Sequence, residues 1–196
     1  IAVHEALEQF TRRMINKNSF PDPSDYDFAV TTFMNAATSE GLENITFYTE
    51  GKQIVTDFVD SFDPSEEIID VEQKFKVSTP EDVPIVGAID KVVKVNDDTI
   101  QIVDYKTSRR ALTPGELNDD IQLSMYDLAA SILWPEFSNR ILTLDYVRID
   151  KTVHSYRTEE QRKTFREFLQ SIWTQINKLD ESKVHGTINH LCGWCD

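Results

Sequence analysis

Two runs of β-branched residues, separated by a short polar segment, constrain the fold of this chain more than any other feature. The runs are residues 84–89 and 100–103, and Asn96-Asp97-Asp98 lies between them. Asparagine and aspartate favour tight turns, so this pattern predicts a β-hairpin. A turn of two to four residues pairs strand positions whose numbers sum to about 194 or 195. Asp90 is therefore expected opposite Asp104 or Tyr105.

The end of this hairpin away from the turn carries charged residues. Because strand side chains alternate, Asp104 and Lys106 share one face while Val103 and Tyr105 share the other. A one-residue bulge or the twist of the sheet would bring Asp90 onto the face of Asp104. Two interpretations stay open: an exposed cluster of ion pairs, or a divalent-cation site in which a lysine orients or deprotonates a bound water.

Bulk composition sets limits on the class of protein. The 196 residues suffice for one domain with its own core, and no apolar run is long enough to cross a membrane. The first ten residues have the pattern of the middle of an amphipathic helix, so we expect one domain over residues 1–196 within a longer protein. The net charge of −14 argues against binding nucleic acid by bulk attraction, unless basic residues cluster locally or a partner supplies them.

Hydrophobic periodicity predicts the remaining elements. Helices are expected at residues 1–17, from Ser24 or Asp25 to Ser39, and at 47–62, 121–133 and 159–179; strands are expected at 68–77, 141–149 and 152–158. The last helix should open with a capping box formed by Thr158 and Gln161. It should bury the stripe Phe165, Phe168, Leu169, Ile172, Ile176 and Leu179. This order of elements predicts an α/β (α+β) fold, one mixed sheet flanked by helices.

Four short motifs stand in order between residues 3 and 126. They are VHEALEQF (3–10), Gly87-x-x-Asp90-Lys91, Asp104-Tyr105-Lys106 and Gln122-x-x-x-Tyr126. Together they resemble the RecB-like branch of the PD-(D/E)XK nuclease superfamily, which includes AddB-type and CRISPR-associated RecB-like exonucleases. The resemblance implies a restriction-endonuclease-like core and a Mg²⁺- or Mn²⁺-dependent deoxyribonuclease. It also implies exonuclease action on single-stranded DNA or DNA ends, in DNA repair or recombination.

The resemblance also implies a metal centre. His4, Asp90 and Asp104 would be ligands, joined by the backbone carbonyl of Tyr105, and Lys106 would bind the attacking water or stabilise charge on the phosphoryl oxygens. From the residues alone, His4 beside an apolar helix stripe has a second interpretation, a structural histidine at the edge of the core. Lys106 would otherwise be a surface lysine.

Further residues near these motifs are candidates for substrate contacts. Gln122 and Tyr126 are four apart on one helix face, and the resemblance places them near the active site and the DNA backbone. Arg109 and Arg110 directly follow the proposed catalytic strand and are candidates for DNA phosphate contacts. Glu72, on the polar face of the preceding strand, either approaches the site or is simply solvated.

The tail HLCGWCD forms a separate candidate site. Cys192 and Cys195 are the only cysteines, so a disulfide framework is excluded and a reducing, intracellular compartment is favoured. The resemblance implies a [4Fe-4S] cluster whose other two cysteines lie outside this chain. A zinc site that includes His185 or His190 is a second interpretation, and two unligated thiols are a third.

Rival functions remain at this stage. One is a catalytically inactive nuclease-fold module that binds DNA or acts as a scaffold in a recombination or repair complex. Another is a different metal hydrolase on a similar sheet. The expected partners are DNA and other subunits or domains of a helicase–nuclease or CRISPR-type assembly, with no membrane contact.

Overall fold

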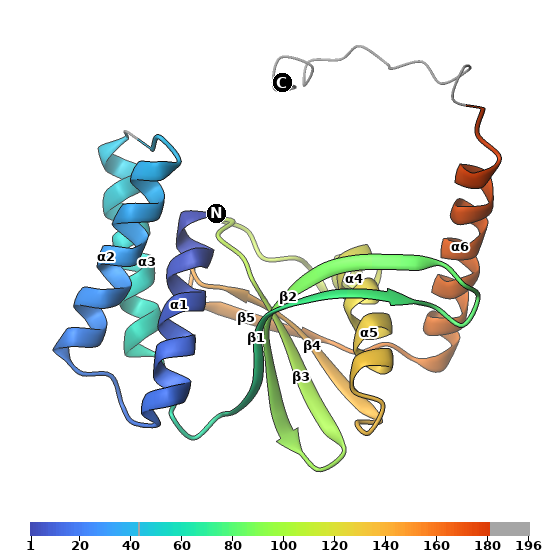
Figure 1. Cartoon of the computed structure of the whole chain (residues 1–196), viewed down its shortest axis with the longest axis horizontal. Coiled ribbons are helices and arrows are strands. Elements are labelled where there is room, and N and C mark those ends of the chain that lie inside the picture. The colour runs from blue at the N-terminus through green and yellow to red at the C-terminus, as the bar shows by residue number, and fades with distance from the viewer. Residues whose placement is uncertain (43, 181–196) are drawn as a thin grey trace.

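A five-stranded mixed sheet forms the centre of the molecule (Figure 1). The computed structural model describes residues 1–42 and 44–180. The strands are β1 (Glu67–Ser78), β2 (Pro84–Asn96), β3 (Thr99–Tyr105), β4 (Asn139–Tyr146) and β5 (Lys151–Ser155). They lie side by side in chain order; β3 and β4 are parallel and the other neighbours are antiparallel. The predicted mixed sheet flanked by helices is confirmed.

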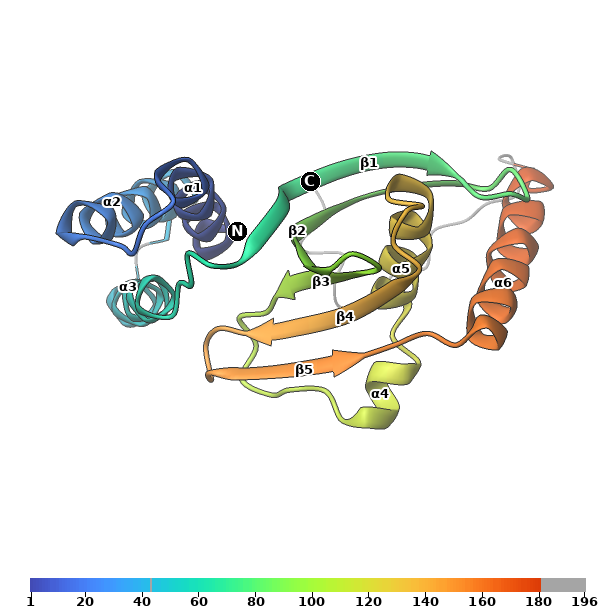
Figure 2. The same cartoon turned by 90° about the horizontal axis from the view of Figure 1, so that it is seen from below.

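Helices cover both faces of the sheet. They are α1 (Ala2–Lys17), α2 (Pro23–Ser39), α3 (Ile45–Asp60), α4 (Pro114–Asn118), α5 (Ile121–Leu133) and α6 (Glu159–Asn177). The first three gather at one end of the sheet, and α6 stands at the other (Figure 2). No helix in the described part of the chain is long and apolar enough to cross a membrane.

The hairpin of β2 and β3 has the predicted register. Lys91 pairs with Val103 and Val92 with Ile102, and Asn96 and Thr99 flank a two-residue turn. The next pair along this register is Asp90 and Asp104. The tight turn at Asp97-Asp98 thus fixes which two carboxylates meet at the open end of the hairpin.

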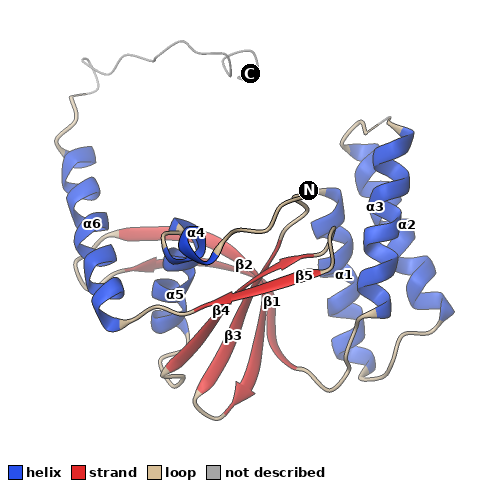
Figure 3. Cartoon of the chain, turned by 180° about the vertical axis from the view of Figure 1, so that it is seen from behind, coloured by secondary structure: helices blue, strands red, loops and turns tan. Residues whose placement is uncertain are grey.

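Side-chain alternation along β3 divides its residues between two cores. Val103 and Tyr105 pack in the core under α1, α2 and α3. Ile100 and Ile102 pack in the core that contains α5, and Asp104 follows them on that face, as its bonds to α5 show. The predicted division of faces is therefore confirmed. β3 is the central strand of the sheet, between β2 and β4 (Figure 3), and it carries the polar end of the hairpin between the two cores.

Helix starts differ from the prediction where side chains cap them. Asp22, not Ser24 or Asp25, caps α2: its carboxylate accepts the Ser24 N–H at 2.8 Å, and Asp25 accepts the Asp22 N–H at 2.8 Å. Pro23 takes the first helical position, where no N–H is needed. Asn44 likewise caps α3, which begins at Ile45, two residues before the predicted start at residue 47. Helix α4, which was not predicted, begins with a capping box from Thr113 and Glu116.

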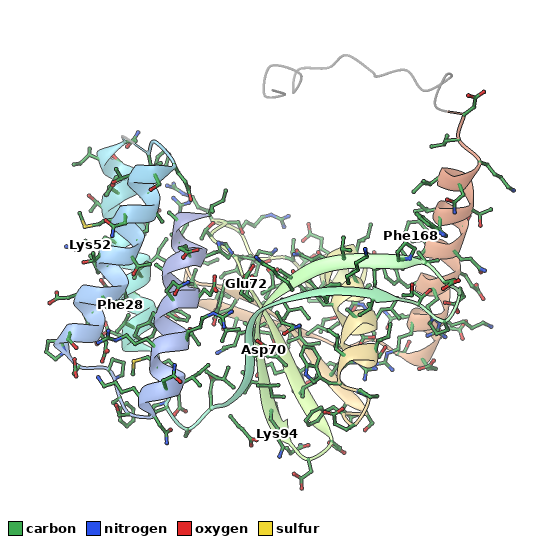
Figure 4. The ribbon with its side chains drawn as sticks, viewed as in Figure 1. Phe28, Lys52, Asp70, Glu72, Lys94 and Phe168 are labelled. Atoms are coloured by element: carbon green, nitrogen blue, oxygen red, sulfur yellow. The ribbon has the colours of Figure 1, made fainter. Side chains whose placement is uncertain are left out.

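Helix α6 has its predicted capping box but not its predicted burial. Phe165 and Leu169 lie partly buried against the main core. The remaining members of the stripe are 38–60% exposed; they are Phe168, Ile172, Ile176 and Leu179. Figure 4 shows Phe168 on α6 at the edge of the molecule. The prediction was wrong because periodicity identifies the apolar face of a helix, whereas burial also requires a neighbour along its whole length.

Candidate active site

The end of β3 places Asp104 in a buried, polar environment formed by α5. Asp104 is 4% exposed. Its Oδ1 accepts hydrogen bonds from Gln122 Nε2 at 2.9 Å and from the Tyr126 hydroxyl at 3.2 Å. Gln122 and Tyr126 lie one turn apart on α5, so a single helix face holds this carboxylate. Burial beside Asp104 raises the pKa of Tyr126, which keeps its hydroxyl protonated as a donor.

Lys106 completes this cluster from the segment after β3. Its Nζ lies 2.6 Å from Asp104 Oδ2 and donates a hydrogen bond of 2.8 Å to Gln122 Oε1. The Gln122 amide therefore accepts from the lysine through its oxygen and donates through its nitrogen to Asp104 and Tyr126. This arrangement fixes the amide orientation. The Lys106 side chain is one-third exposed, so the ammonium stands between the buried carboxylate and solvent.

The other side of the site is built by β2 and α1 around the backbone of Tyr105. Asp90 Oδ2 accepts the Tyr105 N–H at 2.7 Å. His4, in the first turn of α1, has its Nε2 2.8 Å from the Tyr105 carbonyl oxygen and 3.8 Å from Asp90 Oδ2. Burial raises the pKa of Asp90 to about 6, and the neighbouring Asp104 charge adds to this shift, against the lowering effect of the Tyr105 N–H.

Strand β1 adds Glu72 beside this carboxylate. Val71 pairs with Lys91 and Gln73 with Ile89, which leaves Glu72 opposite Asp90 in the register. Glu72 has φ of +50°, a left-handed conformation that is costly for a non-glycine residue. Its negative charge contributes to the raised pKa of Asp90. Of the two interpretations left open, solvation and approach to the site, the structure supports approach; Figure 4 shows Glu72 on β1 next to α1.

Gly87 of the second motif has a packing role. A Cβ at this position would lie 2.6 Å from the ring of Phe75 on β1, so any side chain there would displace the ring. The Phe75 ring in turn meets Tyr126 edge to face, with centroids 6.5 Å apart. The glycine therefore lets Phe75 support the tyrosine that binds Asp104. This role of Phe75 has no signal in the sequence, where Phe75 is one apolar position among several in an alternating strand.

The donor set suits a hard divalent cation. Two carboxylates, the Tyr105 carbonyl and the His4 imidazole face one another across the end of β3. Asp104 Oδ2 is buried and accepts no hydrogen bond of good geometry; its one polar contact is the ion pair with Lys106. Among the described residues, no three His, Cys, Asp or Glu side chains already stand at metal-binding spacing. Metal binding would thus require small shifts, including separation of His4 from the Tyr105 carbonyl.

The two arginines after β3 differ in their engagement. Arg110 donates two hydrogen bonds, of 2.8 and 2.9 Å, to Glu116 at the start of α4. The Arg109 side chain is 72% exposed, and its shortest distance to Glu50 is 3.4 Å, longer than either bond of Arg110. Arg109 is consequently the freer of the two for a phosphate contact. The predicted ligands Cys192 and Cys195, with His185 and His190, lie outside the described residues.

Comparison with known proteins agrees with this geometry. The sequence profile of the PD-(D/E)XK nuclease superfamily matches residues 1–196. A search of curated proteins gave no significant match. The matched region contains the whole sheet and every residue of the cluster around Asp104. The chain belongs to the PD-(D/E)XK nuclease superfamily.

Proposed function

We propose that this nuclease hydrolyses DNA phosphodiester bonds as a RecB-like exonuclease that depends on Mg²⁺ or Mn²⁺. The observation that carries the proposal is the cluster at the end of β3, where Lys106 contacts both Asp104 and Gln122. A lysine held against a buried carboxylate at the end of a strand has few structural uses. Single-stranded DNA or DNA ends are the substrates that the RecB-like motifs imply.

Each residue has a role in this mechanism. Asp90, Asp104, His4 and the Tyr105 carbonyl would hold the cation, which when bound polarises a phosphoryl oxygen and lowers the pKa of water. Lys106 orients the attacking water with its ammonium group or stabilises the charge that develops on the phosphoryl oxygens. Gln122 and Tyr126 act as positioning residues, because their hydrogen bonds hold Asp104 and, through the Gln122 oxygen, Lys106.

A cleavage assay on end-labelled linear and circular DNA tests this proposal. The expected result is Mg²⁺-dependent loss of label from linear DNA, with circular DNA resistant and EDTA abolishing cleavage. Cleavage of circular DNA would replace exonuclease with endonuclease action. Cleavage of mononucleotides alone would point to a different metal hydrolase. DNA binding with no cleavage under any divalent metal would support the inactive scaffold module. The net charge of −14 and the pairing of Arg110 with Glu116 do not favour such a purely DNA-binding role.

The cysteine tail stays a separate part of the proposal. We propose that Cys192 and Cys195 bind a [4Fe-4S] cluster with two cysteines from outside residues 1–196, within a longer protein of a helicase–nuclease or CRISPR-type assembly. Anaerobically purified full-length protein should then be brown, and its colour should be lost in Cys192→Ser. A colourless protein with stoichiometric zinc would support the zinc site instead.

A further inference from the structure

A small hollow opens beside the proposed catalytic residues, on the side of α1 and α3. Its volume is about 210 Å³. Val3, the neighbour of His4, and Thr107, the neighbour of Lys106, both line it. The wall opposite them is mainly apolar and comes from the α2 and α3 region, including Phe33, Leu42, Phe47 and Ile54. The proposed catalytic residues do not line the hollow themselves, but Val3 and Thr107 place it one residue along the chain from His4 and from Lys106.

The polar groups of this hollow are already paired. Arg148 donates through Nε to Glu50 Oε1 at 2.6 Å and through Nη1 to the Thr107 carbonyl at 3.3 Å. The hydrogen bond from Arg148 lowers the pKa of Glu50, so this carboxylate stays ionised and bound to its arginine. Glu40 adds a second carboxylate to the lining. Two carboxylates disfavour a phosphate in the hollow, and an uncharged, flat group suits it better.

Phe47 supplies the surface for such a group. Phe47 is 50% exposed on the first turn of α3 and also lines the hollow, so its ring is open to a ligand. Arg109, 72% exposed and held only loosely by Glu50, is close by. Proteins that bind single strands pair aromatic rings, on which bases stack, with cations that follow the backbone. Phe47 and Arg109 offer this combination, because Arg109 reaches Glu50, which lines the hollow three residues after Phe47 on α3.

We propose that this hollow binds one unpaired nucleobase of the DNA strand being cut, stacked on Phe47, while Arg109 contacts the adjoining phosphate. The inference rests on the proposed DNA nuclease function and gives a physical reason why single-stranded DNA would be preferred to duplex DNA. A base inside a duplex is already paired and stacked on its neighbours, so it can enter the hollow only after it is unpaired. The hollow thus selects single strands or frayed ends.

The test measures the affinity of a labelled oligodeoxynucleotide in EDTA, where no cleavage occurs. Phe47→Ala should weaken binding roughly ten-fold, and Phe47→Trp should retain it, because stacking needs a ring rather than phenylalanine itself. The loss should be the same at low and high salt, since stacking displaces no counterions. Phe20→Ala is the matched control; Phe20 is 72% exposed between α1 and α2, away from the hollow.

An abasic scan assigns the contact to a base. Removing the base that occupies the hollow should weaken binding to the parent protein, and Phe47→Ala should then cause no further loss. Additive losses at every position would overturn the proposal, as would parent-like affinity of folded Phe47→Ala. Tighter, Phe47-dependent binding of RNA of the same sequence would overturn the assignment to DNA. If the parent protein cleaves DNA while these binding results fail, only this inference is wrong; absence of any cleavage would overturn the proposed function itself.

Discussion

The two sides of Asp104 are built very differently. On the α5 side, Gln122 and Tyr126 surround the carboxylate with hydrogen bonds among partners on one rigid helix. On the α1 side, His4 and Asp90 each bond to the backbone of Tyr105 and lie 3.8 Å apart, and the His4 side chain is 37% exposed. The α5 side is thus organised before any ion binds, whereas the α1 side holds groups that an ion can bring together. Substitutions on the α5 side should therefore change mainly kcat, and substitutions on the α1 side should change mainly the affinity for Mn²⁺.

The largest effect is expected where the two sides meet. Asp104→Ala or Lys106→Ala should reduce the cleavage rate by roughly 100- to 1,000-fold or more, because each removes a charge aligned with the reacting phosphate. Rates on end-labelled DNA, with circular dichroism to verify folding, measure this. Lys52→Ala, at an exposed lysine on α3 (Figure 4), is the matched control and should cut at the parent rate. A folded Lys106→Ala protein with parent activity would show that the site is assigned wrongly.

A smaller effect is expected on the α1 side. His4→Gln should weaken Mn²⁺ affinity by roughly 10- to 100-fold, the range known even for residues that only support metal ligands. Calorimetric titration of the protein with Mn²⁺ measures it, and high Mn²⁺ should restore part of the activity. His154→Gln is the control, since that ring contacts Thr143 on the neighbouring strand. Equal Mn²⁺ affinity in both variants would leave His4 as a structural histidine at the edge of the core.

The parts of the site that depend on local sequence could be predicted, and a part that depends on long-range strand pairing could not. The turn at residues 97–98 and strand alternation are local, so they sufficed to place Asp90 near Asp104 and to separate Tyr105 from it. The left-handed Glu72 opposite Asp90 carries no local signal, because glutamate does not favour positive φ. Its conformation follows from the pairing of β1 with β2, which is a long-range contact.

Helices α1 and α6 show the same limit on a larger scale. Both have an apolar stripe at helical spacing, and the sequence predicted burial for both. In α1 the stripe is covered by α2, α3 and the sheet, and Leu7, Phe10 and Met14 are almost fully buried. In α6 only the first half of the stripe meets the core. A stripe predicts which side of a helix faces inward, but the length of the covering surface depends on the whole fold.

A third effect concerns the stability of the metal-free protein on the α1 side. The pKa of Asp90, about 6 in the folded protein, lies above the usual 3.8 of an unfolded aspartate. The folded state therefore binds the proton more tightly, and this contribution to stability is present below pH 4 and lost as pH rises through 6. Asp90→Asn should stabilise the metal-free protein at pH 7.5 by roughly 2 kcal/mol and by much less at pH 4.5.

Urea unfolding in EDTA at the two pH values measures this difference. Asp97→Asn, in the fully exposed hairpin turn, is the control and should change stability little at either pH. A gain for Asp90→Asn that is equal at both pH values would mean that ionisation of Asp90 is not its cause.

The smallest effect belongs to the longer of the two hydrogen bonds that α5 makes to Asp104. Tyr126→Phe removes one donor at 3.2 Å from Asp104 but leaves the Gln122 bonds to Asp104 and Lys106 in place. A hydrogen bond of this kind contributes about 1 kcal/mol, so kcat should fall about five-fold with Mn²⁺ affinity nearly unchanged. Gln122→Ala, which frees Lys106 and Asp104 together, should lower kcat further. Tyr126→Phe could instead weaken Mn²⁺ affinity as strongly as His4→Gln. Both sides of Asp104 would then contribute to ion binding alike, and the distinction between a preorganised α5 side and an α1 side assembled by the ion would be wrong.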